Sequence, residues 1–409
     1  MKPEVARMVD RTLDAGDGIL RLAPTWVPRA FLVPGRRLKL APSDIFALGA
    51  HRGGIDERWL GSTIPADNEG APSDEGLSYV VGPEARFTLR DAIGDAGDRL
   101  IGRQLMDAYG GWTVFAKFFD NLGPIPHHLH QRAQHAALVG REPKPEAYYF
   151  PPQLNAVRHR FPYTFFGLEP GTSPADVRRC LERWDRGDNG ILDLSRAYRL
   201  APGTGWLVQA GILHAPGSLV TYEPQWASDV FAMFQSTLED RPVPWSLLVK
   251  DVPPERHHDL DFLIGLIDWE ATVDPAFKAH HYLEPIPAGA PDEGGDDRWI
   301  VYGRIGGRPL LAARELTVHP GATVRLRDGA ASCVVAVQGR GFLGRYPVET
   351  PTTIRFGEMT ADEFFITAEA AGAATAIRNA GSEPLVLLRY FGPGAIDGVP
   401  EVGAVRPQG

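Results

Sequence analysis

The chain has 409 residues, of which 44% are hydrophobic and 23% charged, a composition typical of a folded protein of two or three domains. Its net charge of −9, from 42 basic and 51 acidic residues, argues against general binding to nucleic acids or membrane surfaces. No run approaches the roughly 18 apolar residues of a spanning helix, and the first residues lack the apolar core of a signal peptide. We therefore expect a cytoplasmic protein with neither a membrane nor a nucleic acid as partner.

The glycine, proline and cysteine contents indicate the structural class of the protein and its redox compartment. The 45 glycines and 36 prolines are scattered between short apolar runs, which is typical of proteins built from short strands and tight turns. Cys180 and Cys333 are far apart and lack the spacing of a metal site. They predict two structural thiols in a reducing compartment and no disulfide framework.

The first part of the chain mixes helical and strand-like segments. In chain order, the residues predict a helix over 1–20, a strand at 57–64, an acidic loop at 67–75, a short helix capped by Thr88 and a buried strand at 115–120. The segment richest in potential metal ligands follows directly.

That segment is predicted to be a hairpin. His128 and His130 are two residues apart on a strand, so both imidazoles point to the same face. After a loop, Lys144, Glu146 and Tyr148 alternate on a second strand. Two histidines would then face a glutamate across the hairpin, which is half of a metal site.

Two further elements follow in the middle of the chain. Ser173, followed by proline, predicts a capped helix over 173–184. Residues 205–225 predict two strands around a tight turn, with His214 at the end of the first strand and Glu223 near the end of the second. His214 is thereby a candidate to complete the metal site.

The pattern changes near Trp299 to evenly spaced short strands, which suggest a small sandwich or barrel; jelly rolls of this kind include the cupins. The predicted strands are Leu316–Val318, Thr323–Leu326, Cys333–Val337, Thr353–Phe356, Phe364–Ile366, Thr375–Ile377 and Leu385–Tyr390. This part shows no set of metal ligands, so we expect it to be structural.

Four residues are thus candidate metal ligands: His128, His130, Glu146 and His214. Imidazole and carboxylate groups suit zinc, iron, manganese or nickel. A single histidine is more often a surface or hydrogen-bonded residue than a ligand, but this combination is typical of a metal site. His127 points to the opposite face of its strand and is not a predicted ligand.

Several segments, in order, resemble the type I phosphomannose isomerases, metal-dependent members of the cupin superfamily. The resemblance covers roughly residues 50–235 and, more loosely, the C-terminal unit. The matching segments are Glu57-Arg-Trp59, Thr88-Leu89, Phe115–Asp120, His128-Leu-His130, Lys144-Pro-Glu146, Gln209–Ala215, Glu223 and Ala227-Ser-Asp229.

For the fold, the resemblance implies a mainly β protein with two cupin (double-stranded β-helix or jelly-roll) domains and a few accessory helices. The implied parts are an N-terminal segment plus metal-binding cupin over 1–245 with a helical insertion at 173–200, a connector over 246–295, a second cupin without metal ligands over 296–395, and a tail over 396–409. We expect a monomer or a homodimer.

For the site, the resemblance implies one divalent metal ion per chain, held by the four candidate ligands, with zinc first and iron, manganese or nickel as alternatives. Glu223 and Lys144 would be catalytic, and Lys144 and Asp229 would lie beside a sugar or sugar phosphate. Aldose–ketose isomerisation moves a proton between adjacent carbons. This needs a Lewis acid for the oxygens and a carboxylate or amine for the proton.

Two departures from the family leave the function open. His128 stands where the family has a glutamine ligand, giving three histidines and one glutamate as in cupin oxidases and dioxygenases. The family's phosphate-binding arginine would lie near Met233, where no basic residue stands, although Lys117, Arg132 and Arg141 are alternatives. The candidates are an isomerase of a phosphorylated or unphosphorylated sugar, a cupin metal oxygenase, and a non-catalytic sugar-binding bicupin.

Overall fold

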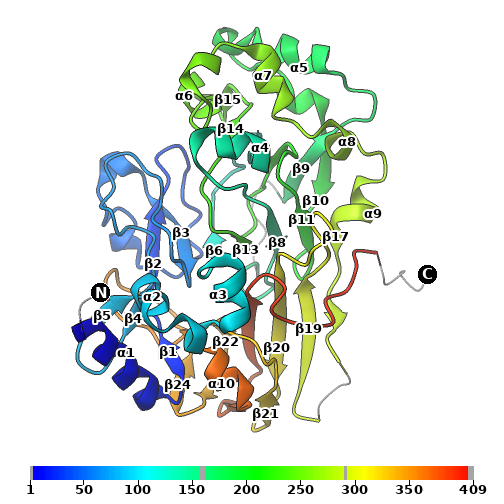
Figure 1. Ribbon diagram of the computed structural model, residues 1–409. Helices are drawn as coiled ribbons and strands as arrows, with labels where there is room; N and C mark the ends of the chain where they lie inside the picture. The colour runs from blue at the N-terminus through cyan, green and yellow to red at the C-terminus, as the bar shows by residue number, and fades with distance from the viewer. Residues whose placement is uncertain (1–2, 157–161, 290–292, 404–409) are drawn as a thin grey trace.

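Strands predominate in the computed structural model, which describes residues 3–156, 162–289 and 293–403 (Figure 1). The larger sheets contain five, seven, seven and four strands, and all their strand pairs are antiparallel. Two two-stranded ribbons, β4–β5 (Tyr79–Val81, Arg86–Thr88) and β15–β16 (Thr237–Leu238, Arg241–Pro242), accompany them. Within the described residues the fold is therefore the mainly β architecture expected from the sequence.

The first unit pairs a five-stranded sheet with a seven-stranded one across a shared apolar core. The five-stranded sheet has the order β10 (Ser195–Arg199), β9 (Tyr163–Leu168), β12 (His214–Ala215), β7 (His128–Leu129) and β14 (Ala232–Met233). The seven-stranded sheet has the order β17 (Tyr282–Leu283), β11 (Gly205–Val208), β8 (Glu146–Tyr149), β13 (Thr221–Trp226), β6 (Val114–Phe119), β3 (Ile55–Leu60) and β2 (Thr25–Pro28).

The second unit repeats this plan with a seven-stranded and a four-stranded sheet around its own core. The seven-stranded sheet has the order β1 (Ile19–Arg21), β25 (Glu363–Ile366), β22 (Ser332–Gln338), β27 (Leu385–Phe391), β20 (Ala312–Val318), β19 (Gly295–Val301) and β18 (Ile286–Pro287). The four-stranded sheet has the order β21 (Thr323–Leu326), β26 (Thr375–Asn379), β23 (Arg340–Leu343) and β24 (Tyr346–Glu349). Strand β1 comes from the N-terminal end of the chain, so both ends of the sequence build this unit.

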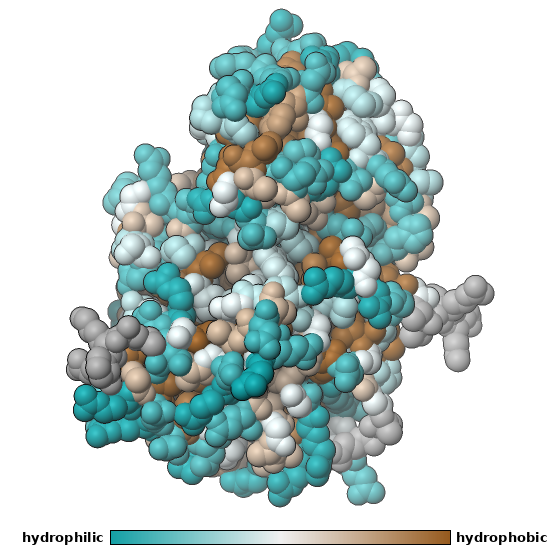
Figure 2. All heavy atoms as spheres, in the orientation of Figure 1, coloured by the Kyte–Doolittle hydropathy of each residue, from teal (hydrophilic) through white to brown (hydrophobic). Residues whose placement is uncertain are grey.

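Helices lie at both ends of the molecule and along one side between them (Figure 1). Their bounds are α1 (Pro3–Gly16), α2 (Leu89–Leu100), α3 (Arg103–Tyr109), α4 (Ala133–Ala136), α5 (Pro174–Leu181), α6 (Trp245–Leu248), α7 (Leu260–Gly265), α8 (Trp269–Thr272), α9 (Phe277–His281) and α10 (Ala368–Gly372). None of the helices in the described ranges is long and apolar enough to cross a bilayer. Hydrophilic side chains cover most of the face in Figure 2, with apolar ones between them in patches.

Local signals in the sequence placed the helix starts correctly. The Thr88 side chain accepts a hydrogen bond from the Asp91 backbone N–H at the start of α2. Ser173 and Asp176 form a reciprocal capping box at the start of α5. The helix predicted over 1–20 ends earlier, at Gly16, because the chain enters β1 three residues later.

The predicted hairpin is wrong, although its residues do meet. Strand β7 lies in the five-stranded sheet and β8 in the seven-stranded sheet, and α4 and a turn of 3₁₀ helix separate them. His128 and Glu146 therefore belong to opposite walls of the first unit, because each strand finds its partners far along the chain.

Two further strand predictions are also wrong. Residues 205–225 form three strands, because the chain leaves the seven-stranded sheet after β11, adds β12 to the five-stranded sheet and returns as β13. Residues 353–356 form no named strand; Ile354 makes one isolated bridge with Leu40. Within the predicted tail, residues 404–409 lie outside the part of the chain described by the structure.

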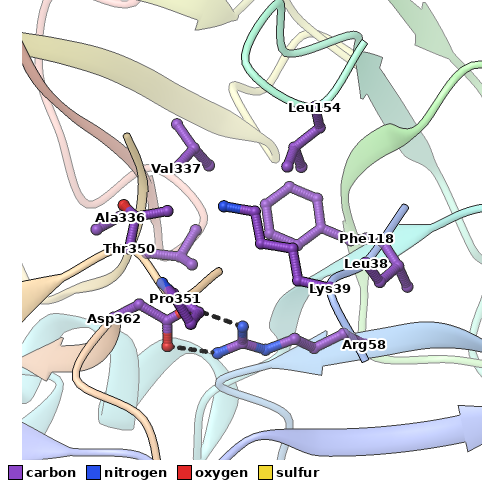
Figure 3. Close-up of a pocket in the computed structure, with 11 residues that line it drawn as sticks. Leu38, Lys39, Arg58, Phe118, Leu154, Ala336, Val337, Thr350, Pro351 and Asp362 are labelled. Atoms are coloured by element: carbon purple, nitrogen blue, oxygen red, sulfur yellow. Dashed lines mark hydrogen bonds and ion pairs between the residues drawn. The ribbon is translucent and has the colours of Figure 1, made fainter. Parts of the chain in front are cut away.

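The two seven-stranded sheets pack against each other and join the units. Phe118 and Tyr222 of the first unit share one apolar cluster with Val335 and Leu388 of the second. Beside this contact lies a cavity of about 20 Å³, room for about one water molecule (Figure 3). Its lining contains none of the predicted metal ligands; the residues are Leu38, Lys39, Arg58, Phe118, Leu154, Val335, Ala336, Val337, Thr350, Pro351 and Asp362.

Candidate metal centre

Three histidines converge in the interior of the first unit. His128 and His214 are register partners on neighbouring strands, and His130 lies two residues beyond His128. One ring nitrogen from each histidine lies within 4.8 Å of the others. The exposed fractions of His128, His130 and His214 are only 6%, 4% and 0%, so the cluster is buried.

The hydrogen bonds of the three rings determine which nitrogen faces the centre. The Nδ1 atoms lie 2.7, 2.7 and 2.8 Å from the carbonyl oxygens of Pro126, Val230 and Ile212, respectively. Because a carbonyl oxygen only accepts, each Nδ1 carries the hydrogen, and in a neutral ring each Nε2 presents a lone pair. Burial lowers the pKa of His128, and it lowers that of His130 to about 4, which keeps these two rings neutral.

Glu146 closes the cluster from the opposite sheet. Its Oε2 lies 2.9 Å from His130 Nε2, and its Oε1 lies 3.1 Å from His214 Nε2. These contacts join an acceptor to an acceptor. Lys144 Nζ lies 2.9 Å from Glu146 Oε2 and 3.3 Å from His130 Nε2, whereas His214 Nε2 has no hydrogen-bond partner. The remaining contact, between His214 Nε2 and Glu146 Oε1, brings two unshared electron pairs together in a buried site, where a cation between them would be favourable. Three nitrogens and a carboxylate are the donor set of a zinc, iron, manganese or nickel site, so the residues fit the expected divalent ion.

Tyr148 holds the carboxylate in position. Its hydroxyl donates to Glu146 Oε1, and both residues lie on the same face of β8. The ring is 1% exposed and packs edge-on against Phe119 and near His214. A buried neighbour of this kind orients a ligand and tunes its basicity.

Lys144 and Glu223 lie directly beside the cluster. Lys144 Nζ is 2.9 Å from Glu146 Oε2 and 3.3 Å from Glu223 Oε1. Burial, and then the negative charge of Glu146, raise the pKa of Glu223 to about 8. A buried carboxyl with a pKa near neutrality can both accept and release a proton.

Asp229, also predicted to lie in the site, forms its ion pair with Arg29. Both its oxygens accept from Arg29, at 3.0 and 3.1 Å. Although burial alone would raise it, the Arg29 charge holds the pKa of Asp229 well below its usual range. Arg29 continues to Glu57, and Lys117 links Glu57 to Glu223, so this network connects Asp229 to the centre.

Sequence reasoning did not predict how three residues of the network are paired. Glu57 was named only as part of the Glu-x-Trp segment and Lys117 only as an alternative phosphate-binding residue, and no local pattern indicated their partners. Arg29 had no signal at all, because its partner Asp229 is 200 residues away. His127, which was not a predicted ligand, lies 3.2 Å from the Ser195 hydroxyl, and burial lowers its pKa to about 3.

Comparison with known proteins places the fold. No family model matches the sequence, and no curated protein sequence matches it significantly. Among solved structures, the chain is similar to mannose 6-phosphate isomerase from Bacillus subtilis, with 16% identity, a TM-score of 0.59, and coverage of 91% of this chain and 99% of that one. A phosphomannose isomerase variant from Salmonella typhimurium gives 12% identity and a TM-score of 0.61, covering 92% of this chain and 99% of that one.

A zinc-bound mannose 6-phosphate isomerase is equally similar, with 13% identity, a TM-score of 0.60 and coverage of 92% of this chain and 99% of that one. The similarity spans both units and extends over nearly the full length of each relative. This chain therefore has the fold of the type I phosphomannose isomerases, as its segments suggested.

Proposed function

We propose that this protein is a metal-dependent aldose–ketose isomerase. The observation that carries the proposal is the buried set of three Nε2 lone pairs and one carboxylate, which face one another beside the Lys144–Glu223 pair. The shared fold with enzymes named as mannose 6-phosphate isomerases supports the choice of reaction.

In this proposal, His128, His130, Glu146 and His214 hold one divalent ion, most simply zinc. The ion would supply a Lewis acid for the oxygens on the two reacting carbons of the sugar. Tyr148 keeps the Glu146 carboxylate oriented by donating to Oε1. The imidazole orientations are fixed from outside by the three backbone carbonyls that accept from Nδ1.

Glu223 would carry the proton between the adjacent carbons. Its pKa of about 8 lets it take up a proton from one carbon and return it to the next near neutral pH. Lys144, 3.3 Å from Glu223 Oε1, stabilises the carboxylate form and donates to an oxygen of the substrate. Near-complete burial of both residues excludes water, which protects the proton from exchange.

The test is an isomerase assay on protein of measured metal content. Purified protein is analysed for zinc, iron, manganese and nickel, and ketose formation is then followed from D-mannose and from D-mannose 6-phosphate. We expect one ion per chain, ketose from at least one sugar, loss of activity after chelation, and its return with added metal. The Glu223→Gln variant should keep its metal and lose activity. Metal-loaded protein that converts neither sugar would refute the proposal.

A metal oxygenase is the second candidate, favoured by the three-histidine, one-glutamate composition of the site. It predicts substrate-dependent oxygen consumption by the iron-loaded protein. An oxygen electrode separates the two proposals, because isomerisation consumes no oxygen.

We also propose that the protein is located in the cytoplasm. Cys180 and Cys333 are both free and buried, which suits the reducing cytoplasm.

A further inference from the structure

An unbroken ion-pair chain runs outward from the candidate metal centre. In it, carboxylates and cations alternate, and every link is 2.9–3.4 Å long. We call this series the ion-pair chain; its members are Glu146, Lys144, Glu223, Lys117, Glu57, Arg29 and Asp229. A carboxylate stands at each end, so each of its three cations lies between two carboxylates.

The outer end of the chain continues into a second group of paired charges. The Asp67 backbone N–H donates to Asp229 Oδ2 at 3.1 Å. The Asp67 carboxylate binds Lys250 at 2.8 Å and Arg141 at 2.9 Å. Lys250 also lies 3.4 Å from Asp251. We call Asp67, Lys250, Arg141 and Asp251 the outer branch.

Leaving out Glu146, which the proposed function assigns to the metal ion, the ion-pair chain and the outer branch contain five cations and five carboxylates, a formal charge of zero. Two of the three residues named as alternatives to the family's phosphate-binding arginine, Lys117 and Arg141, are thus already paired with carboxylates. The third, Arg132, lies 3.8 Å from Asp268 and donates to the Gly265 carbonyl. Among the described residues of this network, each cation is balanced by a protein carboxylate.

A phosphate dianion binds where cations or backbone N–H groups are in surplus. To recruit Arg29, Lys117 or Lys144, it would have to separate a buried pair and leave a carboxylate uncompensated, which is strongly unfavourable. A neutral sugar meets no such penalty, because its hydroxyls can donate to the carboxylates and accept from the ammonium groups without breaking a pair.

We propose, on the basis of the isomerase function above, that this site selects an unphosphorylated aldose over its phosphate ester. The ion-pair chain and its outer branch determine this specificity, because their carboxylates neutralise the Lys and Arg side chains that would otherwise bind a phosphate.

The first experiment compares kcat/KM for D-mannose and D-mannose 6-phosphate on the same metal-loaded preparation, at an ionic strength of about 0.15 M, which screens the repulsion of a phosphate by the net charge of −9. We expect the value for mannose to be higher by about 100-fold. Equal or higher kcat/KM for the phosphate overturns this inference and leaves the isomerase function standing. Ketose from neither sugar refutes both.

A binding measurement gives a second readout that does not depend on turnover. Titration calorimetry with D-mannose and D-mannose 6-phosphate should show tighter binding of the neutral sugar. Tighter binding of the phosphate ester would contradict the inference, whether or not either sugar is converted.

A variant tests the physical cause. Asp67→Asn removes the carboxylate that binds Arg141 and leaves Lys250 paired with Asp251, so the outer branch then has one more cation than carboxylates. We expect the ratio of kcat/KM for the phosphate to that for mannose to rise about tenfold. The matched control, Asp10→Asn, makes the same charge change on α1, where Asp10 forms an exposed ion pair with Arg99 of α2, and should leave the ratio unchanged. The same ratio in both variants would contradict the role of the outer branch.

Discussion

At the scale of single residues, the candidate metal centre is a cluster of acceptors. Each Nδ1–H is used by a backbone carbonyl, and the three Nε2 atoms and Glu146 are left facing one another. Among the described residues, Lys144 is the one Lys or Arg that forms an ion pair with Glu146, and it also forms an ion pair with Glu223. A further positive charge inside the cluster, such as a divalent ion, would therefore stabilise it.

Removing one ligand should release the metal. His214→Ala takes away the fully buried Nε2 that faces both Glu146 and His128, and we expect metal affinity to fall by more than about 100-fold. Elemental analysis after gel filtration measures the loss. His51→Ala, at an exposed histidine, is the control and should keep one ion per chain. Full metal occupancy in the His214 variant would disprove its role as a ligand.

Tyr148, which orients Glu146, and its neighbour Tyr149 on β8 allow a matched pair of variants. Tyr148→Phe removes the hydroxyl that donates to Glu146 Oε1, and we expect metal affinity to fall about 10- to 100-fold. Tyr149→Phe loses a bond of 2.8 Å to Glu315 on the other side of the sheet and should leave metal affinity unchanged. Competition with a chelator of known affinity compares the two. Equal affinities would show that the Tyr148 hydroxyl has no role at the centre.

At the scale of elements, the site depends on strands that change sheets. Between β11 and β12 the chain crosses from the seven-stranded to the five-stranded sheet, and Gly211 makes the crossing at φ +93°. Its N–H donates to the His130 carbonyl at 2.8 Å, and its carbonyl accepts from Asp268 at 2.9 Å. This short connection delivers His214 to the partner position of His128.

A side chain at position 211 should disturb both folding and metal binding. In Gly211→Ala the new Cβ would lie 3.0 Å from Arg132 and Asp268 side-chain atoms, and the backbone angle is unfavourable for an L residue. We expect the free energy of unfolding to fall by about 2 kcal/mol or more, with weaker metal binding.

Gly140→Ala is the control for that variant. Gly140 also has a positive φ, +67°, but nothing lies within 4 Å of the position that an alanine Cβ would take there. We expect the free energy of unfolding of this variant to fall by about 1 kcal/mol, because of the backbone angle alone, and its metal affinity to stay unchanged. Urea unfolding and chelator competition measure both quantities, and equal losses in the two variants would contradict the role of the crossing.

At the scale of the whole molecule, buried charges join the two units. Arg58 on β3 donates to Asp362 at 2.8 and 2.9 Å and to Glu363 at 2.9 Å (Figure 3 shows the Asp362 bonds). Glu363 is 1% exposed, and its Oε1 has no hydrogen-bond partner. Burial raises its pKa to about 7, although Arg58 opposes the shift.

This carboxyl should make stability depend on pH. Because the pKa rises from 4.5 in the unfolded chain to about 7 in the folded one, the folded state binds the proton more tightly. The stabilisation is complete below pH 4.5 and is lost as the pH rises through 7, an effect of about 3 kcal/mol. Glu363→Gln should remove this slope. Urea unfolding at several pH values measures it, with Glu369→Gln, at a half-exposed residue, as control. An unchanged slope would refute the assignment.

The sequence by itself determined what depends on neighbouring residues. The His-x-His spacing placed His128 and His130 on one face, and Thr88 and Ser173 marked helix starts, because strand alternation and capping act over two or three residues. Most strands of the second unit followed from their apolar runs for the same reason. The four candidate ligands could be named because their residue types and order are characteristic.

Only the tertiary structure decided which strands share a sheet and which charges meet. The pairing of β7 with β12, the position of β8 on the opposite wall, and the entry of β1 into the second unit depend on contacts far along the chain. The bond from Arg29 to Asp229 likewise spans 200 residues. Such contacts are selected by the packing of whole sheets and by the cost of leaving a charge unpaired, and no local pattern records either.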